Sequence, residues 1–305
     1  MSKIDSLQPD PTVIGEVAEP PLARLPDPAT LFNIRAERLR ELSAQHQLAS
    51  FLLFLSGLSS CQHALQDGLP DVDLPGEPER QRARDHAMPP LGGGRFTADA
   101  AYDATLERLL TLAAGVDMPE AARTALASVS AADAATRTAL AEAVLANEIP
   151  VQDFAAHVFV AAALQVHYAR LASALEMKKL VPVGDGVCPA CGGAPVASMV
   201  VGWQGAHGAR FCVCSLCATQ WNYVRIKCTL CSSTEGIIYR EVEGGNGTLW
   251  GETCDKCRGY VKILHQHKNP ALDPVADDVA SLALDLLLRE DSYRRGSVNP
   301  FLLGY

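Results

Sequence analysis

The amino-acid sequence predicts an α+β protein in which an all-helical domain comes first, two small β modules follow in tandem, and a helix ends the chain. Three observations predict this order. Apolar residues recur at helical spacing through the Ala- and Leu-rich stretch 31–182. Short runs of β-branched and aromatic residues replace that pattern over 183–268. A pattern of four cysteines occurs twice in this second region.

The composition is that of a folded chain of about two domains, since the 305 residues are 48% hydrophobic and 20% charged. The longest apolar stretches are shorter than the roughly 18 residues of a membrane span. The first residues lack the apolar core of a signal peptide. A net charge of −9 repels polyanions. We therefore expect a cytoplasmic protein that neither inserts into a membrane nor binds nucleic acid.

The first thirty residues, 1–30, form a Pro-rich arm, because six prolines fix the backbone and remove hydrogen-bond donors. We expect either an extended arm or a tail without fixed structure. The helical domain follows over 31–182. Its predicted helices cover 31–45, 48–66, 97–116, 119–128, 131–147 and 152–177.

Three further features of the helical domain are predicted by its sequence. Ser130 and Asp133 have the spacing of a capping box, which predicts the start of the fifth helix. Residues 67–96 are rich in proline and glycine and predict one long loop. In the last helix a single apolar stripe faces the core, and it consists of Phe154, Val158, Ala161, Leu164, His167 and Leu171.

Residues 269–305 predict a C-terminal helix followed by a tail. Asp273 takes the N-cap position and Pro274 the first helical position. Asp277 and Asp278 then lie in the first turn, where the helix dipole favours negative charge. We interpret this pair as helix-terminus charges rather than as an acid–base dyad. The predicted buried stripe is Val275, Val279, Leu282 and Leu286.

The cysteines of the β region form a duplicated pattern. A Cys-x-x-Cys pair, 22 intervening residues and a second pair make one unit, and the same unit recurs forty positions later. This recurrence indicates an internal duplication. The first module covers 183–226 and the second 227–268, with strands expected at 197–201, 221–226, 237–241 and 260–265. The eight candidate metal ligands are Cys188, Cys191, Cys214, Cys217, Cys228, Cys231, Cys254 and Cys257.

The spacing favours two metal sites over disulfides. A β-hairpin that carries two Cys-x-x-Cys turns is a zinc-ribbon-like arrangement, in which four thiolates complete a tetrahedral site. Disulfide-dense chains are typically small and secreted, unlike this one. We place one four-cysteine site within each repeat, although spacing alone leaves exchange of pairs between repeats open. Zinc and iron both suit four sulfur ligands. Gly192, directly after Cys191, makes that turn the best formed of the four.

The other cysteines and the histidines near the repeat have simpler interpretations. We interpret Cys212 as a spare thiol beside a site and Cys61 as a small core residue. His207, His265 and His267 are interpreted as ordinary histidines, because four sulfurs already complete each metal shell. The sequence contains no phosphate loop, dinucleotide fingerprint or nucleophile elbow. We therefore name no catalytic and no cofactor-binding residue and expect a protein that is not an enzyme.

Several segments besides the cysteine pairs are distinctive, namely 221–228, 260–264, 276–285 and 299–302. Together they resemble the FdhE family of formate dehydrogenase accessory proteins. The specific motifs cover about 185–305, and the helical part agrees with the family in type and placement. Cys212 is not a position that the family pattern requires.

The resemblance implies a cytoplasmic maturation factor that binds the catalytic subunit of a molybdenum-dependent formate dehydrogenase. It also implies rubredoxin-like modules that hold two iron ions, one in each four-cysteine site, with zinc as the alternative metal. The sequence does not determine the oligomeric state.

Two other functions stay open at this point. A zinc-ribbon nucleic-acid-binding protein needs a basic surface, but residues 188–268 hold only eight Lys and Arg against five Asp and Glu. An electron-transfer protein would use the same four-cysteine sites. It would need a partner, because no flavin or nicotinamide motif is visible.

Overall fold

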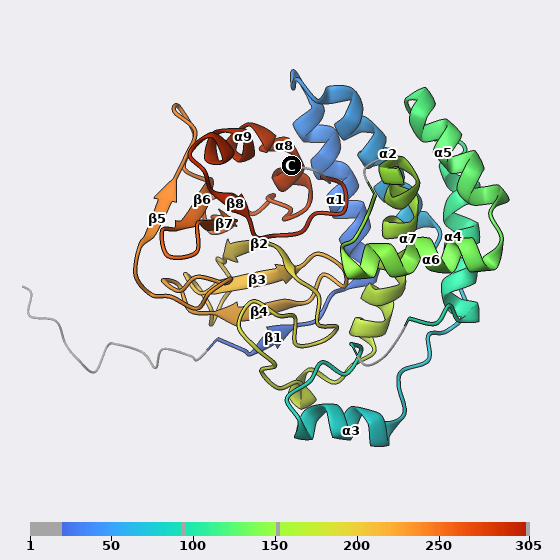
Figure 1. Ribbon diagram of the computed structural model, residues 1–305, viewed down its shortest axis with the longest axis horizontal. Helices are drawn as coiled ribbons and strands as arrows, with labels where there is room; N and C mark the ends of the chain where they lie inside the picture. The colour runs from blue at the N-terminus through green and yellow to red at the C-terminus, as the bar shows by residue number, and fades with distance from the viewer. Residues whose placement is uncertain (1–19, 93–95, 151–152, 303–305) are drawn as a thin grey trace, which may run out of the picture.

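The computed structural model describes residues 20–92, 96–150 and 153–302. The described residues form helices and one eight-stranded sheet, which confirms the predicted α+β class. The sheet and the long helices lie side by side, with the short C-terminal helices above the sheet and one isolated helix below it (Figure 1). Residues 1–19 of the predicted Pro-rich arm lie outside the described residues.

The helical part agrees with the sequence in order and type. Its longest helix, α7, lies at the centre and contacts α1, α2, α4, α5 and α6. The helices are α1 (Pro28–Ser43), α2 (Ala49–Ala64), α3 (Glu77–Asp85), α4 (Ala100–Ala113), α5 (Glu120–Ala131), α6 (Ala134–Ala146) and α7 (Phe154–Ser173).

The predicted single stripe on α7 is too narrow. Residues on every side of this helix are buried between Phe159 and His167, because other helices and the sheet surround it. Phe154, at the start of the predicted stripe, is only partly buried. A helix that is apolar all round belongs in the middle of a core, and alanines let its neighbours approach closely.

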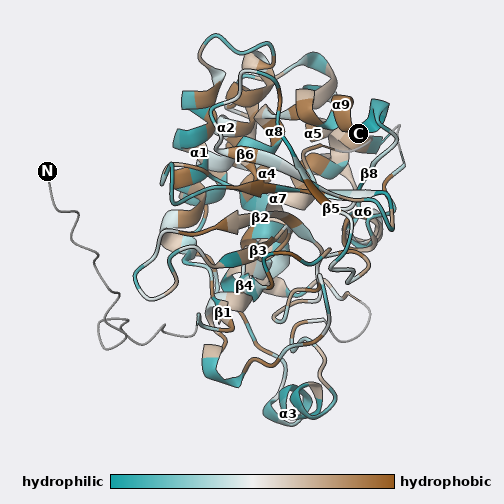
Figure 2. Cartoon of the chain, turned by 90° about the vertical axis from the view of Figure 1, so that its left-hand side faces the viewer, coloured by the Kyte–Doolittle hydropathy of each residue, from teal (hydrophilic) through white to brown (hydrophobic). Residues whose placement is uncertain are grey.

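The prediction of an uninterrupted loop over 67–96 is wrong, because α3 lies within it. Glu77 and Glu79 occupy the first turn and Arg82 and Arg84 the last, so charges at both ends complement the helix dipole. No residue of α3 is buried. Figure 2 shows it as a hydrophilic helix set apart from the body. Such a helix lacks the apolar periodicity by which the other helices are recognised.

Aspartates begin several of the helices. Asp99 Oδ1 accepts a 2.7 Å hydrogen bond from the backbone N–H of Tyr102, and Asp133 Oδ1 accepts one of 2.8 Å from Thr136. The predicted capping box with Ser130 is therefore wrong. Ser130 still belongs to α5, where its hydroxyl donates to the carbonyl oxygen of Leu126 at 2.8 Å.

The sheet contains two copies of a three-stranded antiparallel unit. In the first unit β3 pairs with β2 and β4, and in the second β6 pairs with β5 and β7. β2 and β7 pair in parallel and join the two units into one continuous sheet. The strands are β2 (Pro195–Val200), β3 (Arg210–Cys214), β4 (Gln220–Tyr223), β5 (Ile237–Arg240), β6 (Leu249–Cys254) and β7 (Gly259–Leu264).

The sequence located four of these six strands and missed β3 and β6. Both missed strands end on a cysteine of a Cys-x-x-Cys pair. The cysteine spacing therefore hid the alternation of residues by which a strand is predicted. The predicted strand 221–226 is too long, because β4 ends at Tyr223 and the chain then turns. At the outer edge of β4 lies a further strand, β1 (Ala23–Arg24), in which Ala23 opposes Trp221. Part of the predicted arm is thus an ordered edge strand.

The predicted C-terminal helix is interrupted. It consists of α8 (Ala276–Ala280) and α9 (Leu282–Glu290), and a short strand β8 (Arg294–Arg295) follows and pairs with β7. Asp273 Oδ1 accepts hydrogen bonds from the backbone N–H of Val275 and Ala276 at the start of α8. The helix itself begins at Ala276 with Val275 as its N-cap, so the prediction that Pro274 takes the first helical position is wrong. The break at Ser281 rotates the second half, so that Leu284 and Leu288 are buried and Leu286 is exposed.

One hydrophobic core connects the helices to the sheet. It contains Leu52 and Leu106 from the helical part together with Phe211 from β3, Leu264 from β7 and Val279 from α8. This continuity fixes the cysteine-bearing sheet rigidly against the helical part.

Candidate metal centre

The structure brings the eight candidate cysteines together in two groups of four. In each group the sulfur atoms all lie within 4.8 Å of one another, and each group comes from a single repeat. In the first group, Cys188 Sγ lies 3.6 Å from Cys217 Sγ, and Cys191 Sγ lies 3.4 Å from Cys214 Sγ. In the second, Cys228 and Cys257, and Cys231 and Cys254, are each 3.7 Å apart at Sγ.

These distances fit a metal ion and not a disulfide. A metal that binds four thiolates at about 2.3 Å places neighbouring sulfurs about 3.8 Å apart, whereas bonded sulfurs are about 2.05 Å apart. All cysteines of the chain are free thiols. Each group can therefore hold one metal ion with sulfur alone, and the donor set suits zinc and iron equally.

All four Cys-x-x-Cys turns share one backbone geometry. The residue directly after the second cysteine has a left-handed φ in every turn, although only one of the four is glycine. The expectation that the turn with Gly192 differs from the others is thus wrong. The four residues and their φ angles are Gly192 (+81°), Ala218 (+58°), Ser232 (+62°) and Arg258 (+55°).

Backbone N–H groups in the turns point at sulfur. The amides of Gly193, Leu216 and Leu230 each donate to a cysteine Sγ at 3.4 Å. Such hydrogen bonds stabilise a thiolate, the form in which cysteine binds a metal. Gly193 also leaves space, because a Cβ there would lie 3.1 Å from Cys214 Sγ.

Burial opposes ionisation of several of these thiols in the absence of a cation. It raises the pKa of Cys188 well above the ordinary value and raises that of Cys228 to about 12. One thiol in each group shifts the other way. Burial of Cys214 is outweighed by hydrogen bonds from the neighbouring cysteines, which lower its pKa, and the backbone hydrogen bond from Ser233 lowers the pKa of Cys231. A bound metal ion supplies the missing positive charge, so binding must release protons. The groups are consequently built to be stable with a cation rather than as bare thiolates.

The remaining cysteines and histidines lie outside both groups. Cys61 is buried in the helical core, as predicted, and Cys212 is buried on β3 with its Sγ 3.6 Å from Ser198 Oγ. The ring of His265 packs edge-on against Trp250, with ring centroids 4.0 Å apart and an interplanar angle of 64°. Neither this ring nor the other histidines join a cysteine group in the part of the chain that the structure describes.

Buried charges join the two sheet units. Arg210 on β3 reaches across β2 and β7 to Glu252 on β6, with Nη1–Oε2 and Nη2–Oε1 distances of 2.9 and 2.8 Å. Both side chains are at least 96% buried. Burial raises the pKa of Glu252, and the guanidinium opposes that rise. This bidentate pair fixes the position of the second unit relative to the first.

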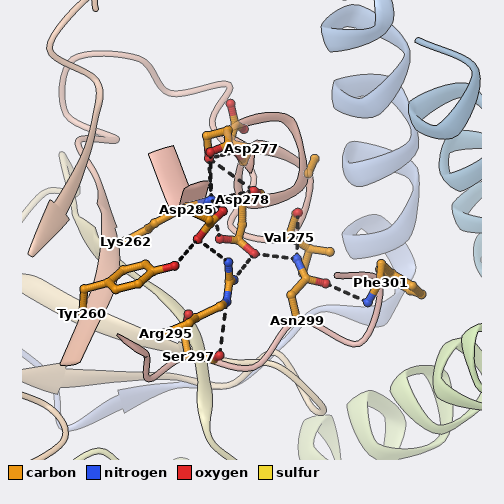
Figure 3. A network of polar contacts seen from close by, with 12 residues as sticks. Tyr260, Lys262, Val275, Asp277, Asp278, Asp285, Arg295, Ser297, Asn299 and Phe301 are labelled. Carbon is orange, nitrogen blue, oxygen red and sulfur yellow. Dashed lines mark hydrogen bonds and ion pairs between the residues drawn. The ribbon is translucent and has the colours of Figure 1, made fainter. Parts of the chain in front are cut away.

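A second buried network attaches the C-terminal helices to the sheet (Figure 3). Lys262 Nζ on β7 lies 3.2 Å from Asp278 Oδ1 and 2.5 Å from Asp285 Oδ2, and Arg295 pairs with the same two carboxylates. Tyr260 donates its hydroxyl hydrogen to Asp285 Oδ1 at 2.7 Å. Two acids and two bases balance, so the network is neutral as a whole.

The interpretation of Asp277 and Asp278 as helix-terminus charges is therefore incomplete. Asp278 is fully buried in the network, and Asp277 pairs with Arg38 of α1 at 2.6 Å. Burial would raise the pKa of Asp278, but the nearby Lys262 and Arg295 charges lower it overall. Burial raises the pKa of Asp277 despite its guanidinium partner. Only the tertiary structure supplies these partners, which come from distant parts of the sequence.

Models of the FdhE family match nearly all of the described chain. The FdhE N-terminal model matches residues 20–185, the FdhE central domain 187–225 and the FdhE C-terminal domain 226–302. The chain belongs to the FdhE family. The resemblance predicted from the cysteine pairs and their flanking segments is thus confirmed.

Relatives support the FdhE assignment over the whole chain. A protein FdhE homolog of Rhizobium meliloti is 46% identical over 304 residues, which cover 99% of each protein. One from Pseudomonas aeruginosa is 37% identical and covers 89% of this chain and 90% of that protein. The crystal structure of the FdhE protein from Pseudomonas aeruginosa matches with a TM-score of 0.82 and 35% identity, over 93% of this chain and 99% of that one.

Within the described residues of this FdhE-family chain, none of the helices has the length and apolar character needed to cross a membrane.

Proposed function

We propose that the protein is a cytoplasmic maturation factor, without enzymatic activity of its own, for a molybdenum-dependent formate dehydrogenase. It would act by binding the catalytic subunit of that enzyme. Membership of the FdhE family supports the proposal, together with two four-cysteine groups on a sheet that is fixed against the helical part. Among the described residues, these two groups are the ones in which three or more His, Cys, Asp or Glu side chains lie close enough together to hold a metal ion.

We also propose that each four-cysteine group holds one iron ion, with zinc as the alternative. The first ion would be bound by Cys188, Cys191, Cys214 and Cys217, and the second by Cys228, Cys231, Cys254 and Cys257. Iron bound by four thiolates can change its oxidation state, whereas zinc cannot. The residues of the chain contribute the sulfur ligands, the amide hydrogen bonds to sulfur and the shape of the turns.

Metal analysis with a visible spectrum of anaerobically purified protein tests the metal proposal. We expect two metal ions per chain and, for ferric iron, a red protein. The Cys228→Ser/Cys231→Ser variant should retain one ion, since the first group is separate from the second. A preparation that binds no metal when fully reduced would contradict the proposal.

A strain that lacks the protein tests the maturation role. Complementation with the wild-type chain should restore formate dehydrogenase activity, and the catalytic subunit should co-purify with a tagged copy. Complementation with the Cys228→Ser/Cys231→Ser variant should leave the dehydrogenase polypeptide at its normal level but inactive. Full activity in the uncomplemented strain would refute the proposed function.

A further inference from the structure

The two four-cysteine groups differ in how they are covered. In the first group every cysteine is buried, and the most exposed, Cys191, is only 8% exposed. The second group has two buried cysteines, but Cys257 is half-buried and Cys231 is exposed. Equivalent cysteines of the two repeats therefore lie in environments that differ in solvent exposure.

The helical part covers the first group. Leu91, in the segment after α3, donates its backbone N–H to the carbonyl oxygen of Ala190 at 2.9 Å, inside the first Cys-x-x-Cys turn. At Gly92 an added Cβ would lie 2.9 Å from the carbonyl oxygen of Cys191, so this segment lies directly on the turn. The four sulfurs also belong to a hydrophobic cluster with Trp221 and Leu175.

Two segments also lie against the turns of the second group, but they leave Cys231 exposed. An added Cβ at Gly186 would lie 2.1 Å from the carbonyl oxygen of Thr229, and the backbone N–H of Arg294 donates to the carbonyl oxygen of Arg258 at 2.7 Å. Leu230, within its first turn, is 41% exposed although its side chain packs against Gly259 and Gly296. The neighbouring strand β5 pairs only with β6, at the free edge of the sheet (Figure 1). Thirteen large apolar side chains are exposed in the described ranges. Six of them lie within residues 224–242, namely Val224, Ile226, Leu230, Ile238, Tyr239 and Val242.

We infer that the two groups have different tasks: the first is a closed structural centre, and the second is an open centre whose metal can exchange with its surroundings. The inference rests on the proposal that both groups hold metal ions. A closed four-ligand site excludes an incoming donor atom, whereas an exposed ligand gives a chelator or a partner protein direct access to the ion. Exchange from the first group requires the chain to open locally, which adds a free-energy cost.

Chelation kinetics test this division. Protein loaded with two equivalents of Zn²⁺ is mixed with the coloured chelator 4-(2-pyridylazo)resorcinol, and zinc release is followed by absorbance. We expect two phases of one equivalent each, with the fast phase at least about tenfold faster, which corresponds to about 1.4 kcal/mol of opening. Release of both equivalents at one rate would overturn the inference.

Matched variants assign the phases. Cys228→Ser/Cys231→Ser should remove the fast phase, leave the slow one and retain native circular dichroism. Cys188→Ser/Cys191→Ser should lower the melting temperature much more, because its group lies in a hydrophobic cluster. If that second variant does not fold, the first still decides the question. A fast phase that survives in Cys228→Ser/Cys231→Ser would refute the assignment. No client protein is needed, so the result is independent of the maturation role.

Discussion

Replacement of Lys262 by methionine tests whether the buried charge network stabilises the attachment of the C-terminal helices. Lys262 is fully buried and lies within 3.2 Å of both Asp278 and Asp285, and its Nζ also donates to Ser281 Oγ at 2.9 Å. Methionine has a similar length but no charge. The variant leaves two buried carboxylates against the single guanidinium of Arg295, and removal of one partner of a buried pair costs about 3–5 kcal/mol.

Urea unfolding followed by circular dichroism at pH 7 measures this loss. The pKa of Asp278 is lowered in the folded protein, because Lys262 and Arg295 outweigh the opposing effect of burial. Its ion pairs therefore stabilise the wild type above about pH 3.9, the usual Asp pKa, and this contribution is lost as pH falls through the lower folded value. In the variant the Asp278 carboxyl loses the Lys262 charge that lowers its pKa and takes up a proton more readily, so the destabilisation should shrink between pH 7 and about 4.

Two further variants complete the experiment. The Lys262→Met/Asp285→Asn protein restores charge balance and should recover about half of the lost stability, since the two sites interact directly. Lys178→Met, at an exposed lysine, should change stability by less than about 0.5 kcal/mol. A cost below about 1 kcal/mol for Lys262→Met, or an equal cost at pH 7 and about pH 4.5, would refute the reasoning.

Two more changes probe the cysteine turns. Gly193→Ala should weaken metal binding at the first group, because the new Cβ would lie 3.1 Å from Cys214 Sγ and the sulfur must shift by a few tenths of an ångström. A chelator should therefore remove the ion of the first group faster from this variant than from Gly184→Ala, where the nearest atom would be 3.7 Å away. Equal release rates in the two variants would contradict this. Ala218→Gly should raise stability by about 1 kcal/mol in urea unfolding, because glycine removes the cost of a left-handed φ of +58°. Lower stability would show that the turn is not strained there.

Each difference between the predicted and the observed elements has its own physical cause. The helix α3 was missed because it has no buried residue, and apolar periodicity identifies only helices that pack on a core. Ser130 and Asp133 both suit a cap, and the end of the preceding helix decides which one is used. The break at Ser281 moves the buried stripe to Leu284 and Leu288 because Lys262 binds the carbonyl oxygens of Asp278 and Ser281 at this bend.

The sequence by itself determined the grouping of the cysteines. Each Cys-x-x-Cys turn is local, and two turns within one forty-residue repeat are brought together by a hairpin, so spacing is enough to predict four sulfurs at one point. It determined the helical character of the first half for the same reason, since periodicity is a local property. The family resemblance likewise depends on short segments.

Only the tertiary structure decided how these pieces differ from one another. The cysteine spacing of the two repeats is the same, yet a segment about a hundred positions earlier covers the first group and leaves the second open. The parallel pairing of β2 with β7 and the partners of Asp277 and Asp278 also come from distant segments. Burial and charge pairing depend on which residues pack against a side chain, and the spacing of cysteines within a repeat does not determine those residues.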